Sequence, residues 1–258
     1  METGLSIRNN QNEITQIIQD SNNMYLSVLQ AVGLPTENVL SSLDERKIAI
    51  ANLPFVIDKM NNELIRESYY LSKFFVAVST GLFDAALNYL WDETIKQLRI
   101  RVINGDIKYF YDVVISDERR KQFTSAEDLL KLDDFDLIKG ALEIGLITQI
   151  GYKHLDFIRY MRNWASAAHP NQAELTGLNL ISWLEICIKE VIATPPSSIQ
   201  VKIGQLLANI KSEVIDDVQA SMIIPFFTEL SIEKADALAK GFLVYTLMKE
   251  QVSRQEVT

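Results

Sequence analysis

The sequence predicts an all-α protein, a helical bundle with flanking helices toward both ends. Among its 258 residues, 48% are hydrophobic and 23% are charged, as expected for a chain that folds around a core. Only ten glycines and six prolines occur, far fewer turn formers than a many-stranded sandwich or barrel needs. Apolar residues also recur at helical spacing through nearly the whole length. Long helices therefore account for the pattern best.

The N-terminal third is predicted to hold three helical segments. Residues 14–29 predict a helix that stops near Gly33, and residues 36–51 predict a short helical connection. Pro54 suits the first turn of a helix, because that position needs no backbone N–H. We therefore expect one long helix over residues 55–79.

The middle of the chain alternates turn signals with helical patterns. Gly81 marks a break before a helix over residues 82–103. Residues 109–115 have the highest strand propensity, but they have no second strand to pair with, so we expect a helix or an extended connector. Residues 125–128 (Ser-Ala-Glu-Asp) have a capping-box pattern that predicts a helix start, and residues 133–145 predict another helix with an acidic first turn.

Two further helices are predicted over residues 148–168, which Pro170 ends, and over residues 173–193. Residues 194–198 (Thr-Pro-Pro-Ser-Ser) form the clearest linker, and two or three more helices follow it.

We expect three parts: an N-terminal helical arm at 1–79, a central bundle at 80–194 and a C-terminal helical extension at 195–258. No self-similar period of 20–50 residues occurs, which argues against a solenoid.

Charge and cysteine content limit the classes of function. The net charge is −9, so the chain as a whole lacks the basic character of proteins that wrap nucleic acid, and any contact with RNA must be local. Cys187 is the only cysteine, which excludes an intrachain disulfide and a cysteine-based metal site. No signal peptide and no membrane-spanning apolar run is recognisable, so we expect a cytoplasmic protein with no membrane contact.

The segment most suggestive of chemistry is residues 162–169, Arg-Asn-Trp-Ala-Ser-Ala-Ala-His. Seven residues make nearly two helical turns, so Arg162 and His169 project from one face. Arg159 and Ser166 share that side, within an arc of about 80°. His169 falls at the helix end, where the backbone dipole favours the imidazolium form.

These side chains suit the cleavage of RNA by its own 2′-hydroxyl. Histidine accepts and returns a proton near neutral pH, and the arginine fork stabilises the charge that develops on the phosphoryl oxygens. Asn163, beside the arginine, can orient the phosphate or the histidine. This chemistry requires neither a metal ion nor another cofactor.

Arg162-Asn163 followed by His169 resembles the Arg-polar-x(3–5)-His motif of HEPN-type ribonucleases. The layout before it is also similar, with a helix of the type 82–91 and the Gly-Leu-Ile element at 145–147 leading into the motif helix. The resemblance covers roughly residues 80–194. It implies a small helical bundle, usually a homodimer, in which Arg and His of both protomers line an RNA-cutting cleft.

The resemblance further implies a hydrolase that serves as a toxin or as an effector of antiviral defence, with an antitoxin or defence protein as a partner. It implies catalytic roles for Arg162, Asn163 and His169. We expect Arg159 and Lys153, basic residues upstream on the same helix, to contact the RNA.

Structural alternatives stay open for the same residues. His169 is also suited to cap a helix C-terminus, and Arg162 to form an ion pair with Asp156 or Glu174. The basic cluster Arg119-Arg120-Lys121 suits either a solvated surface or RNA backbone contacts. The alternative function is a non-catalytic helical dimerisation or adaptor module within a defence or toxin–antitoxin complex.

Overall fold

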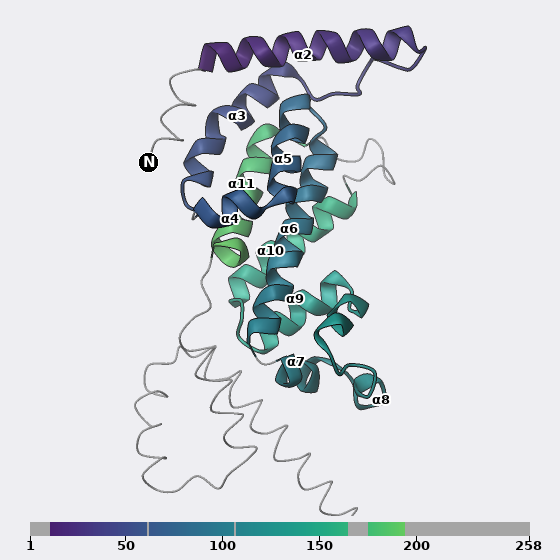
Figure 1. Cartoon of the computed structure of the whole chain (residues 1–258), viewed down its shortest axis with the longest axis vertical. Coiled ribbons are helices and arrows are strands. Elements are labelled where there is room, and N and C mark those ends of the chain that lie inside the picture. The colour runs from purple at the N-terminus through teal and green to yellow at the C-terminus, as the bar shows by residue number, and fades with distance from the viewer. Residues whose placement is uncertain (1–10, 61, 106, 165–174, 194–258) are drawn as a thin grey trace, which may run out of the picture. The chain divides into compact units, whose positions relative to one another are not determined.

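The computed structural model describes residues 11–60, 62–105, 107–164 and 175–193 (Figure 1). The described residues form helices joined by short connections, and none of them is in a β-strand. The predicted all-α class is therefore confirmed. The predicted C-terminal extension at 195–258 lies outside the described residues.

The chain divides into two compact units. The first comprises Met1–Lys96 with His154–Ala193, and the second comprises Gln97–Lys153 with Thr194–Thr258. Helices α6 and α10 each contribute residues to both units. The division into an arm, a central bundle and an extension differs from these units and stays a prediction.

The first unit contains most of the described helices. Its elements are α2 (Gln11–Ala31), α3 (Leu43–Ile57), α4 (Asn62–Glu67), α5 (Tyr69–Thr80), the part of α6 (Phe83–Asn104) up to Lys96, the part of α10 (Gln149–Trp164) from His154, α11 (Gly177–Cys187) and the π-helical turn η2 (Ile188–Ile192). The helix predicted over 14–29 is confirmed as α2, and the break at Gly81 falls between α5 and α6.

The single long helix predicted over residues 55–79 is wrong. Pro54 lies inside α3 rather than in a first turn, and α3 ends at Ile57. The start of α3 is fixed by Ser42, whose hydroxyl accepts a hydrogen bond from the Glu45 N–H at 3.3 Å. Ser68 begins α5 in the same way by accepting from the Leu71 N–H at 3.1 Å. Apolar residues keep their helical spacing across the breaks after Ile57 and after Glu67, so the spacing could not reveal where these helices end.

The core of the first unit lies where α3, α5, α6 and α11 meet. Phe74, Leu90 and Leu184 are completely buried there, and Trp91 is nearly so. Cys187 is also fully buried, and burial raises the pKa of its thiol to about 12. This cysteine is therefore an unreactive core residue in the folded protein.

Helix α11 begins directly against α3. Thr176 and Asn179 form a reciprocal capping box, and the Gly177 N–H donates to Glu45 Oε2 at 2.6 Å. The absence of a side chain at Gly177 permits this approach, because a Cβ atom there would overlap the Glu45 carbonyl oxygen. An ion pair between Lys59 and Glu185 also joins the two stretches of chain.

Helix α2 is held to the rest of the first unit by one buried arginine. Arg46 is only 2% exposed; its Nε donates to the Ser41 carbonyl at 2.7 Å, and its Nη2 donates to Asn22 Oδ1 at 2.8 Å. Burial lowers the pKa of this guanidinium. The side chain lies against Gly81, which has a φ of 89° and ends α5.

The second unit contains the rest of α6 from Gln97, followed by α7 (Ile107–Val114), α8 (Asp117–Arg120), the 3₁₀ helix η1 (Ala126–Lys131), α9 (Asp134–Glu143) and the first residues of α10. The strand-like segment 109–115 lies mainly within α7, which confirms the helical alternative. Phe110 packs against α9 at Gly140, where a Cβ atom would lie only 2.8 Å from the ring. Tertiary burial of these aromatic side chains thus outweighs their strand propensity.

Several predicted helix boundaries in the second unit are confirmed. The residue pattern 125–128 does begin a helix, although it is the short 3₁₀ helix η1. Asp133 caps α9 by accepting from the Asp136 N–H at 2.8 Å, and Gly145 follows α9 with a φ of 71°. Arg101 Nη2 donates to the Leu146 carbonyl at 2.8 Å, which ties α6 to the start of the next connection.

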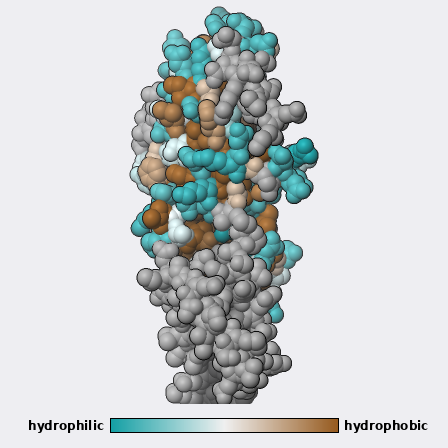
Figure 2. Space-filling model, turned by 90° about the vertical axis from the view of Figure 1, so that its left-hand side faces the viewer, coloured by the Kyte–Doolittle hydropathy of each residue, from teal (hydrophilic) through white to brown (hydrophobic). Residues whose placement is uncertain are grey.

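Hydrophobic residues are also present on the surface. Figure 2 shows them gathered in patches between hydrophilic residues on the face that it presents. Phe55, Val76 and Tyr69 are 53%, 64% and 82% exposed. Of the helices that the structure describes, none is both long enough and apolar enough to span a membrane.

Candidate functional site

Arg162 lies near the end of α10, on the face that the helix buries. Leu155 and Ile158 are completely buried on this face, and Arg162 follows them at helical spacing. The arginine therefore ends an apolar stripe and projects toward α6. Earlier on the same helix, the Phe157 ring contacts the Trp183 ring of α11 edge-on, with the ring centres 6.3 Å apart.

Two amide side chains hold the Arg162 guanidinium. Its Nε donates to Asn88 Oδ1 at 2.8 Å, and its Nη1 donates to Asn163 Oδ1 at 3.3 Å. Asn88 is itself oriented, because its Nδ2 donates to the backbone carbonyl of Asp84 at 3.0 Å, one turn earlier on α6. The guanidinium is thus fixed by a neighbour 74 residues away in the chain.

Both partners of Arg162 are uncharged. No carboxylate among the described residues forms an ion pair with it. The alternative of a pair with Asp156 is wrong, because Asp156 binds Arg159 instead; the alternative with Glu174 lies outside the described residues. Among the described residues, therefore, no carboxylate balances the positive charge of Arg162, and this charge can interact with an anion.

Arg159 has a different environment, although it lies on the same helix. Its Nε and Nη2 both donate to Asp156 Oδ1, at 3.1 and 2.8 Å. A phosphate would have to compete with this carboxylate for the guanidinium. The predicted RNA contact of Arg159 is therefore less favoured by its surroundings than that of Arg162.

The other predicted site residues are only partly placed. Lys153 is exposed on α10 and belongs to the second unit, where its Nζ lies 5.5 Å from the centre of the Tyr152 ring. Asn163 lies next to Arg162 and contacts it directly. His169 lies outside the described residues, so its predicted position on the same helical face stays a prediction.

Asn88 is a site residue that sequence reasoning did not single out. It occurs in the helix 82–103 among apolar residues, where a half-buried asparagine has no distinguishing local pattern. Its role depends on a contact between α6 and α10, and neither segment alone reveals that contact. The only sequence signal was a polar asparagine one residue after Leu87 and two before Leu90, both of which are apolar.

No protein-family model, curated protein or solved structure matches the chain. The resemblance to HEPN-type ribonucleases therefore rests on the sequence motif and the helix layout alone. The contacts and charge of Arg162 itself are the features that suit it to bind an anion.

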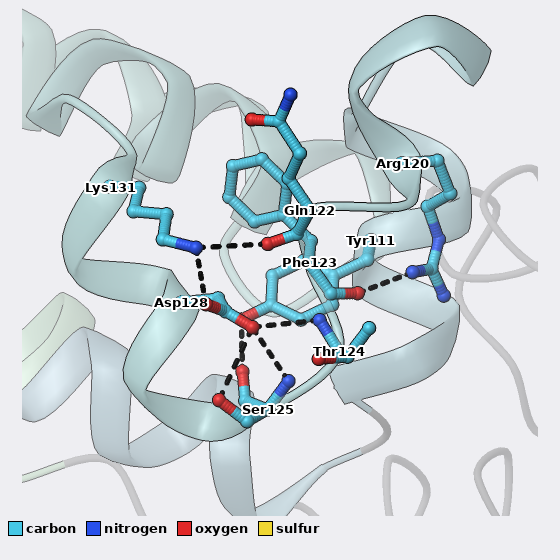
Figure 3. Close-up of polar contacts among 8 residues, drawn as sticks. All are labelled: Tyr111, Arg120, Gln122, Phe123, Thr124, Ser125, Asp128 and Lys131. Carbon is cyan, nitrogen blue, oxygen red and sulfur yellow. Dashed lines mark hydrogen bonds and ion pairs between the residues drawn. The ribbon is translucent and has the colours of Figure 1, made fainter.

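The basic cluster at 119–121 is partly built into the second unit (Figure 3). Arg120 forms an ion pair with Asp112 at 2.7 Å, donates to the Phe123 carbonyl and lies over the Tyr111 ring. Arg120 therefore holds the connection between α8 and η1 in place. These contacts favour a structural role for Arg120 over an RNA contact. Arg119 and Lys121, in contrast, are exposed.

Asp128 organises the same connection from the other side (Figure 3). Its carboxylate accepts from the backbone N–H groups of Thr124 and Ser125, both at 2.8 Å, and forms an ion pair with Lys131. Hydrogen bonds from Lys131 and from these two backbone groups hold the pKa of Asp128 well below its usual range.

Replacing Asp128 with asparagine is expected to destabilise the second unit at neutral pH. The ionised carboxylate stabilises the fold above its unfolded-state pKa of about 3.9, and this contribution is lost as the pH falls through the lower folded-state pKa. The midpoint of urea unfolding, followed by circular dichroism, should therefore be lower for the variant at pH 7. The difference between the two proteins should shrink below about pH 4. An equal difference at pH 7 and pH 2.5 would contradict the assigned role.

Proposed function

We propose that this protein is a metal-independent endoribonuclease of the HEPN type that acts as a toxin or antiviral-defence effector. In this proposal the active form is a homodimer, RNA is a transient substrate, and an antitoxin or defence protein controls the activity. The observation that carries the proposal is the Arg162 guanidinium, which is oriented by Asn88 and Asn163 and has no carboxylate partner among the described residues.

Arg162 in this arrangement suits the binding of a phosphodiester. Neutral amide oxygens fix the plane of the guanidinium without cancelling its charge, so its remaining N–H groups can donate to the non-bridging oxygens of a phosphate. The interaction strengthens as negative charge develops on those oxygens in the transition state. A strongly basic surface is not required for this local contact, which agrees with the net charge of −9.

The proposed reaction is an internal transfer at phosphorus. The 2′-oxygen forms a bond to phosphorus while the bond from phosphorus to the 5′-oxygen breaks, which yields a 2′,3′-cyclic phosphate and a free 5′-hydroxyl. His169 accepts the proton of the 2′-hydroxyl, and the imidazolium returns a proton to the departing 5′-oxygen. Arg162 binds the phosphoryl oxygens, and Asn163 supports the arginine.

Substituting Arg162 is expected to remove most of the activity. In an RNA cleavage assay with EDTA present, Arg162→Ala and His169→Ala in the full-length chain should each lower the rate at least about 100-fold. Arg159→Ala serves as the matched control on the same helix; it should retain activity within about threefold, because its charge is already paired with Asp156.

Asn88→Asp provides a sharper test of the mechanism. The change is nearly isosteric and keeps an oxygen that accepts from Arg162, so the link between α6 and α10 persists, but a carboxylate now neutralises the guanidinium. The carboxylate cannot donate to the Asp84 carbonyl as the amide does, and the stronger bond to Arg162 offsets this loss. We expect thermal stability to change by less than about 1 kcal/mol, together with at least about a tenfold loss of cleavage. Retention of cleavage by both Arg162→Ala and His169→Ala would contradict the proposal that these two residues catalyse RNA cleavage.

A second candidate is a non-catalytic interaction module, and α2 favours it. Ile17, Met24 and Val28 fall on one stripe of α2 at helical spacing, and each is more than half exposed. Sedimentation of the purified chain separates the candidates when combined with the cleavage assay. A protein that is inert toward RNA but dimerises through this stripe supports the module, whereas a monomer that captures no partner contradicts it.

A further inference from the structure

The first unit contains an apolar groove that the ribonuclease proposal does not use. Its cavity volume is about 810 Å³. One wall is α2 with the connection that follows it, and the other is α5 with the beginning of α6. Side chains on these walls include Met24, Val28, Val39, Val76, Leu82 and Tyr89.

The groove is held open by contacts within the fold. Ile18 is the buried anchor of α2. The hydrogen bond from Arg46 of α3 to Asn22 also fixes this helix. Met24 and Val28 are each 56% exposed at the groove, and Val76 on the opposite wall is 64% exposed. Apolar surface of this extent in a preformed hollow is typical of ligand sites.

Among the described residues that line the groove, Lys73 is the only charged one. Its Nζ lies 5.5 Å from the centre of the Tyr89 ring and 5.6 Å from that of the Tyr70 ring. No carboxylate in the described part of the chain forms an ion pair with it, although acidic residues outnumber basic ones by 34 to 25. In the described part of the chain, the groove therefore combines apolar walls with one positive charge that no carboxylate pairs.

We propose that this groove binds a long-chain carboxylate, with the hydrocarbon chain between α2 and α5 and the carboxylate on Lys73. One ammonium group matches the single negative charge of a carboxylate, whereas a phosphate dianion usually recruits several donors. The volume lies within the range of about 300–1,000 Å³ that small organic ligands occupy. A small ligand also needs no surface of about 800 Å² per partner, as a stable protein interface does.

Binding of dodecanoate to the full-length protein tests the proposal. Titration calorimetry below the micelle concentration should show saturable binding of one dodecanoate per chain. Dodecanol, which lacks the charge, should bind at least about tenfold more weakly, and so should hexanoate, which fills less of the groove.

Two variants test the two halves of the site. Lys73→Met keeps an apolar stem but removes the charge; it should weaken dodecanoate about tenfold and leave dodecanol unchanged. Val76→Glu puts an acidic group into the wall at an exposed position and should abolish dodecanoate binding without unfolding the protein. Lys47→Met, at a lysine paired with Asp44 outside the groove, is the matched control and should bind dodecanoate as the unmodified protein does.

Each other outcome overturns the proposal. Equal affinity for dodecanoate and dodecanol, or an unchanged affinity in Lys73→Met, removes the role of the charge. Binding to phosphatidylcholine vesicles without binding of free dodecanoate assigns the groove to a membrane surface. Concentration-dependent dimerisation that Val76→Glu abolishes, together with no dodecanoate binding, assigns it to a second copy of the chain. The cleavage assay of the Arg162 variants is independent of all these results.

Discussion

Replacing Gly177 with alanine is expected to destabilise the first unit by about 3 kcal/mol. The added Cβ would overlap the backbone carbonyl oxygen of Glu45 and lie 3.1 Å from the Ala49 nitrogen. These neighbours are backbone atoms of α3, so the clash can be relieved only by moving α11 away from α3. That movement would also lengthen the hydrogen bond from the Gly177 N–H to Glu45 Oε2.

Helix propensity acts in the opposite direction at Gly177. Alanine is favoured over glycine in a helix interior by about 1 kcal/mol, and this is the upper limit for Gly177, the first residue of α11. Overpacking a tight contact costs about 1–3 kcal/mol, and the upper end applies where rigid backbone must shift. The packing effect therefore decides the sign, and the variant should be less stable.

Tryptophan fluorescence measures this effect in the appropriate unit. The chain has three tryptophans, Trp91, Trp164 and Trp183, and all of them belong to the first unit. The urea midpoint should fall in Gly177→Ala, and the buried Cys187 thiol should become labelled faster. Ser182→Ala introduces alanine at an exposed position of α11 and should change stability by less than about 0.5 kcal/mol. Equal stability of the two variants would contradict the close packing of α11 on α3.

Replacing Gly81 with alanine is expected to cost about 3 kcal/mol through two separate causes. The residue has a φ of 89°, a conformation that disfavours any side chain by about 1 kcal/mol or more. In addition, the new Cβ would lie 2.5 Å from Arg46 Nε and 2.8 Å from its Cζ. Displacing this side chain would break its hydrogen bonds to the Ser41 carbonyl and to Asn22, and the second of these connects it to α2.

The structure supplies a control for each cause. Gly33 has a φ of 77° but nothing within 4 Å of its Cβ position, so Gly33→Ala should show the backbone cost alone, about 1 kcal/mol. Arg46→Ala removes the clashing side chain. In that background Gly81→Ala should cost no more than Gly33→Ala does, because the steric cause is gone. Urea unfolding of the four variants, followed by tryptophan fluorescence, measures the difference.

Two results would contradict this account of Gly81. Equal costs for Gly81→Ala and Gly33→Ala would show that Arg46 does not press on the glycine. Additive costs of Gly81→Ala and Arg46→Ala would show that the two residues act independently.

A loss of dodecanoate binding in Arg46→Ala would indicate that the docking of α2 shapes the proposed groove.

Local chemistry in the sequence predicted much of the fold. Scarce glycine and proline with helical apolar spacing predicted the all-α class. The capping-box pattern at 125–128 and the acidic first turn of the segment 133–145 predicted where two helices begin. These features act over one or two turns, so neighbouring residues contain all the information that they require. The motif residues Arg162 and Asn163 were likewise visible as a pattern, and they do lie in contact.

The tertiary structure decided whatever depends on residues far apart in the chain. Pro54 looked like a helix start, but it is buried inside α3, which ends at Ile57. The aromatic segment 109–115 is largely helical because its rings are buried, with Phe110 packed on α9 at Gly140.

The candidate sites depend on such long-range contacts most of all. Asn88 reaches Arg162 only because α6 lies beside α10, and one wall of the groove at Lys73 is α2, which Arg46 contacts through Asn22. The sequence by itself determined the helices and the side chains capable of chemistry. Their partners and the spaces between them came from packing, because burial and charge pairing are settled between segments and not within them.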